Sequence, residues 1–495
     1  MKRRGFKPNS RTYNVLFSGL SRIEDWKEYN VQFKNAQTLW QGFLQHIERL
    51  KKIDPNHTGI TPNPAAFYIS ILTANGEYNA AFDVLNDLDD EGPFSPTEFV
   101  YSKLFQGIYS RTQLVPGDQE NVAYRNASDV KLLWKNLVKR ATKNPELVSS
   151  HAITHSIRAL AKGRPADQLY AFDLAREFLG LSKPGEEAPQ RRLEVAPIAL
   201  DSVLQLCITT QKYRLCVHYV QQLIDEAIAN EAKCVVDTKH MDKVLQSYAA
   251  MTGAGSVGES DRAVETIKWM HLYHALGWNV KPGPNTYGWG LMSCWRGGDW
   301  ASATRIAELM TGCHAEDFID GSQNSSLPRL DDRTKNKRAV PDVRDMSCLL
   351  RAALASGELA NMRQCLRMAA FFGDLRSTGQ IKSIDLYLAL DDLANTPAAK
   401  RENSFYSMKV VSTMADILKL VLDGTKPEAD TPEMKTWREL RTKTKKILQE
   451  STKPAGGTPY HEHQPLGSAT SLEATGRFVD YDMATRSQKP GKVTR

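Results

Sequence analysis

The stretch PNPAAFYISILTANGEYNAAFDVLNDL, residues 62–88, contains two predicted helices and the break between them. Residues 66–72 are apolar enough for a buried first helix, and Asn75-Gly76-Glu77 interrupts it. A second helix follows, because apolar side chains then recur at a helical spacing, at Tyr78, Ala81, Phe82, Leu85 and Leu88. The segment therefore predicts a pair of short helices joined by a tight turn.

The same unit recurs along the chain. A proline followed by a short residue precedes an apolar helix at Pro62-Asn63 and again about 34 residues later at Pro96-Thr97, a spacing that fits two short helices and their turns. Similar turns occur at Pro8-Asn9, Pro282-Gly283 and Pro341-Asp342. Small residues lie at one point of most second helices, at Ala81, Cys216, Ala263 and Ala303, whereas Met362 departs from this pattern. Since a helical pair exposes an apolar face until a neighbour covers it, the sequence predicts an all-α array.

Two stretches carry a family resemblance. Residues 1–20, with Thr12-Tyr13-Asn14 after the Pro8-Asn9 turn, look like the junction of two pentatricopeptide repeats, and residues 284–310 look like another. The resemblance implies a right-handed α-α superhelical solenoid of helical hairpins over residues 1–375, with about eight pairs. We expect C-terminal helices within 376–450, at 381–422 and 432–450, and a disordered tail over 451–495, which is rich in Gly, Pro, Ser and Thr.

Composition narrows the class of protein. The formal net charge of +7 and the pI of about 8.8 favour a polyanionic partner. The odd number of cysteines, 7, without a CxxC pair predicts buried thiols and no disulfide framework. No apolar run approaches the roughly 20 residues that would cross a bilayer. The basic first residues run directly into a repeat-like turn, so we expect no presequence there and further sequence upstream.

Four interruptions are predicted to be loops, at 111–127, 182–194, 252–260 and 315–340. No phosphate-binding loop is found, and His151 and His155 have the spacing of zinc ligands without the catalytic glutamate between them. The His-x-Glu and CxxC of zinc deaminases and the aspartate cluster of a metallonuclease are missing too. We therefore expect no catalytic site, no metal site and no cofactor.

The resemblance also implies which residues would read RNA bases. In that family the residue after the Thr-Tyr pair acts with the last residue of the repeat, which gives Asn14 with Asn63, a combination that implies a pyrimidine. The same transfer gives Tyr68 with Thr97, and it gives Ser102, Gly288 and Ser347 in other repeats. Tyr68 and Gly288 are not the amide or hydroxyl residues expected, and Tyr68 either stacks on a base or packs inside the array.

Basic clusters suggest phosphate contacts. Residues 329–338 form one cluster, and the other lies on a predicted helix at Lys435, Arg438, Arg441 and Lys445. The resulting hypothesis is a non-enzymatic, single-stranded RNA-binding factor of the mitochondrial matrix. It would act in transcript processing, stability or translation, with small-subunit rRNA maturation and the mitochondrial ribosome as further options. The alternative is a tetratricopeptide-like scaffold that binds proteins.

Overall fold

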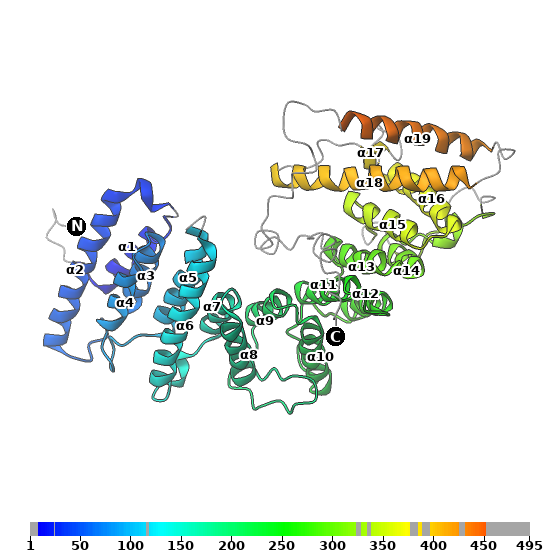
Figure 1. The fold of residues 1–495 in the computed structure, drawn as a ribbon. Helices are drawn as coiled ribbons and strands as arrows, with labels where there is room; N and C mark the ends of the chain where they lie inside the picture. The colour runs from blue at the N-terminus through cyan, green and yellow to red at the C-terminus, as the bar shows by residue number, and fades with distance from the viewer. Residues whose placement is uncertain are drawn as a thin grey trace, which may run out of the picture. The chain divides into compact units, whose positions relative to one another are not determined.

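Helices account for the regular structure in the part of the chain that the computed structural model describes. These residues are 8–23, 25–114, 118–322, 328–333, 338–376, 385–388, 397–424 and 431–451. Within them, the only β-type pairing is an isolated bridge between Cys313 and Leu330. The prediction of an all-α fold is confirmed (Figure 1). The predicted tail lies outside these ranges, apart from Ser451.

The chain divides into two units, and the division falls within α11 (Thr238–Gly253). Unit 1 is Met1–Lys243, and its helices before α11 are α1 (Ser10–Leu20), η2 (Trp26–Glu28), α2 (Asn30–Ile53), α3 (Asn63–Ala74), α4 (Tyr78–Asn86), α5 (Glu98–Leu114), α6 (Gln119–Ala141), η3 (Pro145–Leu147), α7 (Ser150–Ala161), α8 (Pro165–Leu179), α9 (Pro197–Thr209) and α10 (Tyr213–Ala229).

Unit 2 is Val244–Arg495. Its helices after α11 are α12 (Glu259–Ala275), α13 (Pro284–Gly297), α14 (Trp300–Thr311), η4 (Ala315–Phe318), α15 (Val343–Ala355), α16 (Leu359–Arg376), α17 (Asp385–Leu388), α18 (Pro397–Asp423) and α19 (Pro432–Ser451).

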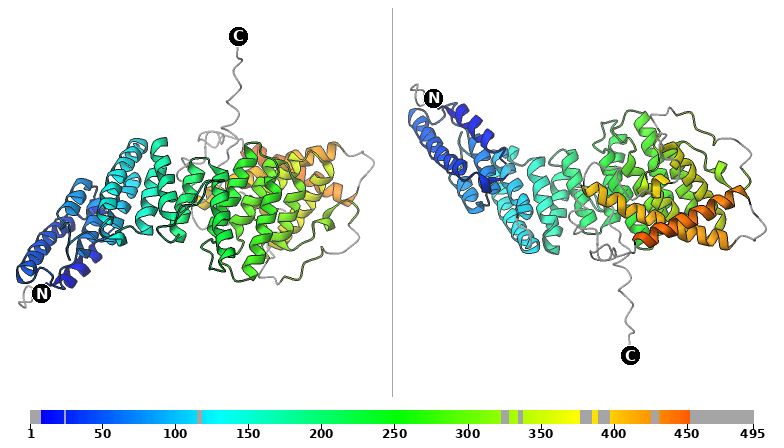
Figure 2. Two further views of the ribbon diagram at one scale, coloured as in Figure 1. Left: turned by 90° about the horizontal axis from the view of Figure 1, so that it is seen from below. Right: turned by 90° about the horizontal axis from the view of Figure 1, so that it is seen from above.

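Two kinds of contact recur within each unit. Consecutive helices pair, as α3 does with α4 and α13 with α14. First helices of successive pairs also pack on each other, in the order α1, α3, α5, α7, α9 in unit 1 and α13, α15, α18 in unit 2. The helices of unit 1 remain side by side in all the views (Figures 1 and 2). A first helix therefore touches its own second helix and the first helices before and after it.

Local signals set the ends of the helices as the sequence suggests. The side chain of Asn9 accepts a hydrogen bond from the Thr12 amide at 2.9 Å and caps α1, and Asp342 caps α15 in the same way. Gly76, in the predicted break between α3 and α4, has φ +87°, and Gly298, between α13 and α14, has φ +64°. Glycine adopts this left-handed conformation without steric cost, which explains its place in these turns.

The recurrent tyrosine of the first helices is a core residue. Tyr13, Tyr101 and Tyr287 are all buried. The ring of Tyr13 lies 5.4 Å from that of Phe43 in α2, and the hydroxyl of Tyr101 donates to Asn136 in α6 at 3.0 Å. Tyr13 and Tyr101 thus each tie a first helix to its own second helix.

One loop prediction is wrong. Residues 111–127 were expected to be a loop, but α5 continues to Leu114 and α6 begins at Gln119. Residues 119–127 are polar overall, yet Val122, Ala123 and Ala127 form a buried stripe that stabilises a helix there. The predicted interruptions at 182–194 and 252–260 do separate helices.

The C-terminal helices continue the pairing. The helix α18 packs on α15 as a further first helix would, and α19 packs on α18. The predicted helix 381–422 corresponds in the described residues to α17 and α18, and the predicted 432–450 to α19.

The predicted state of the thiols is confirmed. All seven cysteines are free; Cys234 is half-buried and the other six are buried. In the described residues, no helix is long and apolar enough to cross a membrane.

The contact between α3 and α5 provides a stability test. A methyl group at Gly107 would lie 2.6 Å from Cβ of Thr73, whose hydroxyl is bonded to the Ile69 carbonyl. We expect Gly107→Ala to lower the free energy of unfolding by about 1–3 kcal/mol, because α3 and α5 must move apart. Denaturant unfolding followed by circular dichroism measures this change.

The control is Gly19→Ala in α1, where a methyl group would meet no atom within 4 Å. We expect this variant to be as stable as the wild type or more stable by up to about 1 kcal/mol, because alanine favours the helix. Equal behaviour of the two variants would mean that α3 and α5 are not closely packed at this point.

Candidate nucleic-acid interface

The first helices of unit 1 leave one stripe of side chains partly exposed. On α5, buried Val100, Leu104 and Ile108 cover the core side. On the opposite side lie half-exposed or exposed residues at a helical spacing, namely Phe99, Ser102, Lys103, Gln106 and Tyr109. The stripe of α7 is His151, His155 and Arg158, extended by Lys162 just after the helix, and that of α3 is Asn63, Phe67 and Ser70. We call these three stripes together the first-helix face.

Direct contacts show that the three stripes lie on one face. The rings of Phe67 and Phe99 meet edge to face at 5.2 Å between centroids. The ammonium of Lys103 lies 5.7 Å from the Phe99 ring centroid. The hydroxyl of Ser102 is 3.4 Å from that of Ser149, the N-cap residue of α7. Aromatic rings and a cation therefore alternate from α3 to α7.

The other end of the stripes is built similarly. Tyr109 of α5 lies 6.4 Å from the His155 ring of α7, and the ammonium of Lys162 lies 5.6 Å from the Tyr109 ring centroid. Beyond α7, Arg158 bonds to Asp201 of α9 at 3.3 Å, and Lys243 lies 3.7 Å from the same carboxylate. The carboxylate of Asp201 therefore lies close to two cations at the α9 edge, whereas the ammonium groups of Lys103 and Lys162 lie close to aromatic rings.

The electrostatics of this face keep His155 neutral. Burial is the main cause that lowers the pKa of His155 to about 4, and the nearby charges of Arg158, His151 and Lys103 contribute in the same direction. His155 Nδ1 makes no hydrogen bond in the structure. No group of three or more His, Cys, Asp or Glu residues among the described ones could hold a metal ion. At neutral pH the imidazole is therefore an uncharged, flat group beside Tyr109.

The predicted base-contact residues of the first two pairs have different surroundings. Asn63 is exposed at the first position of α3, on the first-helix face. Asn14 is half-buried, and its Oδ1 is buried without a hydrogen-bond partner. Thr97 is half-buried just before α5, with an Oγ1 that is likewise unpaired.

Tyr68 lies in the core. Its ring stacks on that of Trp40 at 4.8 Å with an interplanar angle of 17°, and burial raises its pKa to about 12. Two roles were predicted for Tyr68, stacking on a base or packing inside the array. In the structure its ring packs inside the array. The aromatic side chain that emerges on the first-helix face is that of the preceding residue, Phe67, because the helix turns Tyr68 toward α2.

The corresponding positions of the other first helices are more crowded. Ser102 is on the first-helix face, whereas Ser347 in α15 is fully buried. A Cβ at Gly288 would lie 3.2 Å from the Arg344 guanidinium of the next first helix. Arg344 also donates to Asn285 at 3.3 Å. At Gly288 of unit 2, which has no side chain, the neighbouring polar group is therefore the guanidinium of Arg344.

The predicted phosphate contacts of α19 are largely at the surface. Lys435, Arg438 and Lys445 are exposed. Arg441 is half-buried and bonds to Asp423 of α18 at 3.1 Å. The inner side of α19, with Met434, Trp437 and Leu440, is buried. Three of the four predicted cations therefore face solvent on one exposed helix side.

The described arginines of the charge run 329–338 form ion pairs within the chain. Arg329 pairs with Asp317 at 2.8 Å, and both Arg333 and Arg338 pair with Asp331. Lys335 and Lys337 lie outside the described residues. The three described arginines of this loop are thus already engaged with carboxylates.

Comparison with known proteins adds no assignment. No protein-family model matches the sequence, and no curated protein matches it. The resemblance to pentatricopeptide repeats therefore stays a prediction, based on the residues quoted above.

Sequence reasoning missed Phe67, Phe99, Lys103, Tyr109 and Lys162. Their signal was present in the helical spacing of 99, 102, 103, 106 and 109 on the side opposite the apolar stripe. The family resemblance points to one base-contact position in each first helix. It therefore gave no reason to consider the other exposed residues of the same helices.

The buried imidazole predicts a specific titration. We expect His155 to titrate near pH 4 in NMR spectra of the chain with labelled histidine, because burial disfavours the charged ring. Since the unfolded chain binds this proton near pH 6.5, the folding stability should fall as the pH drops from about 6.5 to about 4. His155→Gln should reduce that loss. A midpoint near 6.5 for His155 would instead mean that the ring is fully hydrated.

Proposed function

We propose that this protein binds single-stranded RNA, without catalysis, through the first-helix face. The observation that supports this most is the alternation of half-exposed rings and cations across α3, α5 and α7. Nucleobases stack on such rings irrespective of sequence, and lysine ammonium groups beside them attract the phosphates. The net charge of +7 agrees with a polyanionic partner.

Base preference would come from polar side chains among these rings. Exposed Asn63 and half-exposed Ser102 can hydrogen-bond the edges of unstacked bases. Asn14 is proposed as a base contact through the resemblance alone, because its Oδ1 is buried. The three basic residues exposed on α19 would add phosphate contacts in unit 2.

Two further parts of the proposal, the superhelical architecture and the place of action in the cell, rest on the pentatricopeptide resemblance alone. Within each unit, first helix stacks on first helix, as an array of helical pairs requires. The right-handed superhelical arrangement of the pairs is proposed from the resemblance. The resemblance favours a mitochondrial transcript or ribosomal RNA as the ligand, in the matrix or with the mitochondrial ribosome.

The salt dependence of binding tests the role of the face. Lys103→Gln/Lys162→Gln should reduce the slope of log affinity against log salt by about 1.4 in magnitude, since each phosphate contact to a single strand contributes about 0.7. Fluorescence anisotropy with a labelled oligouridylate of about twenty nucleotides measures this slope.

The control is Lys135→Gln/Lys139→Gln, which changes the charge equally at exposed residues of the second helix α6. We expect its slope to equal that of the wild type. Equal effects of the two double variants would show that only the overall charge matters, and the first-helix face would lose its role.

A second prediction concerns Asn14 and Asn63, which are proposed to share one base. Removing either amide should lose the same preference for a pyrimidine, by roughly 1–3 kcal/mol, and the double variant should lose little more. Affinities for oligonucleotides varied at one position at a time provide the measurement. Asn14→Ala and Asn63→Ala variants that weaken all sequences equally would rule out base reading by this pair.

A further inference from the structure

The helix α1 has an apolar side that the described part of the chain leaves uncovered. Val15 is 62% exposed and Leu16 is 46% exposed, and a methyl group at Gly19 would meet no atom within 4 Å. Together with half-buried Thr12 they lie on one side of the helix, because their spacing is i, i+3, i+4, i+7. We call Thr12, Val15, Leu16 and Gly19 the free side of α1. In unit 1 this helix ends the row of first helices (Figure 2).

A helix of closely similar sequence shows how such a side is covered elsewhere in the chain. Residues 101–108 of α5, YSKLFQGI, repeat the pattern of residues 13–20 of α1, YNVLFSGL. In α5, Leu104 is fully buried, and a methyl group at Gly107 would lie 2.6 Å from Cβ of Thr73 in the preceding first helix, α3. The same pattern is therefore covered by another first helix in α5 but exposed in α1.

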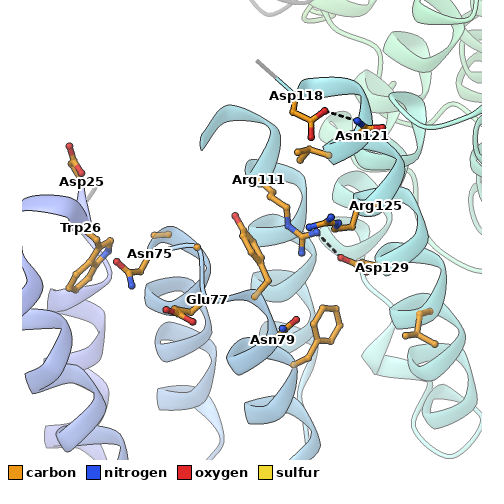
Figure 3. A pocket seen from close by; sticks show the side chains of 16 residues that line it. Asp25, Trp26, Asn75, Glu77, Asn79, Arg111, Asp118, Asn121, Arg125 and Asp129 are labelled. Carbon is orange, nitrogen blue, oxygen red and sulfur yellow. Dashed lines mark hydrogen bonds and ion pairs between the residues drawn. The ribbon is translucent and has the colours of Figure 1, made fainter. Parts of the chain in front are cut away.

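The neighbours of α1 in the sequence leave its free side open. Trp26, in the turn that follows α1, is 2% exposed and lies beside Asn75 of the turn between α3 and α4 (Figure 3). The second helix α2 packs on another side of α1, where the ring centroids of Phe17 and Trp40 are 6.2 Å apart. Both segments thus pack toward the interior of unit 1.

The free side is complementary to itself. When two α1 helices pack antiparallel about a two-fold axis between Val15 and Leu16, these two residues of one copy lie opposite each other's counterparts, and Gly19 lies opposite Thr12. A glycine then meets a threonine, as it does between α5 and α3. The Thr12 hydroxyl already donates to Asn9 at 2.9 Å, so its burial leaves no polar group unpaired. The contact is apolar and removes no charge from water.

Charge agrees with the antiparallel direction. Arg11 is exposed at the start of α1, and α1 has no basic residue in its last turn. In the antiparallel pair, Arg11 of each copy lies near the C-terminal end of the other helix, where the carbonyl groups carry a partial negative charge.

The last first helix of unit 2 does not offer a matching open side. This helix is α18, and α19 packs on it. Its residues Ile417, Leu418 and Val421 are fully buried. End-to-end stacking of copies would need an open first helix at both ends, so the described residues favour pairing of two like ends.

We propose that the free side of α1 docks on the same side of a second copy of this chain, as an antiparallel helix pair. Because α1 has 11 residues, the contact is smaller than the roughly 800 Å² per partner of a stable complex, and the dimer is weak. Dimerisation requires no RNA, so it can be tested separately from the proposed function.

The test places charges next to the two-fold axis. Val15→Lys and Val15→Glu are made in the full chain, and the matched control is Leu169→Lys, at a residue of α8 that is 57% exposed. Sedimentation equilibrium without RNA, between about 5 and about 300 µM protein, measures the average mass, and circular dichroism verifies the fold. The mass of the monomer is 55.5 kDa.

We expect the average mass of the wild type and of Leu169→Lys to rise toward twice the monomer mass as the concentration increases. Each Val15 variant should associate at least about tenfold more weakly, because like charges then face each other. An equimolar mixture of Val15→Lys and Val15→Glu should associate again, since opposite charges meet across the axis. The proposal is overturned if the wild type stays monomeric throughout, if Leu169→Lys weakens association as much as Val15→Lys, or if the mixture does not associate.

Discussion

Close packing of successive first helices is the constraint on which the rest of the structure depends. Each first helix is covered by its own second helix and by the first helices on either side, so most of its circumference is buried. Where two helices approach most closely, small residues are required, as Gly107 against Thr73 and Gly290 between Ile267 and Ile306 illustrate. The stripe left uncovered is narrow, and on α5 and α7 it is the candidate interface itself.

The sequence predicted the helical pairs where apolar spacing and turn signals agreed. Residues 62–88 form α3 and α4 as expected, and the breaks coincide with left-handed Gly76 and Gly298. Prediction was wrong at 119–127, where polar composition hid a buried stripe. The role of α18 could not be predicted either, because its packing on α15 depends on a contact between segments far apart in the sequence, which no local pattern encodes.

The candidate site was predictable only in part, because a motif gives a position but not its exposure. Asn63 and Ser102 lie on the first-helix face, but Tyr68 and Ser347 are buried, and the position of Gly288 is covered by Arg344. Tyr68 and Phe67 are neighbours of similar character, and only the packing against Trp40 decides which of the two emerges. Likewise, the sequence alone did not show that Arg329 pairs with Asp317, or that Arg333 and Arg338 pair with Asp331.

The nearest-neighbour pattern of contacts also bears on how the chain acquires its structure. Most helix pairs that touch are adjacent or next but one along the chain, so few long loops have to close before native contacts form. Such a chain can order itself from its first pairs onward while synthesis proceeds. The ion pair between Arg367 and Glu433, which joins α16 to α19, spans a longer interval. This ion pair can form only after the chain between α16 and α19 has folded back, so we expect it to be among the last contacts to form.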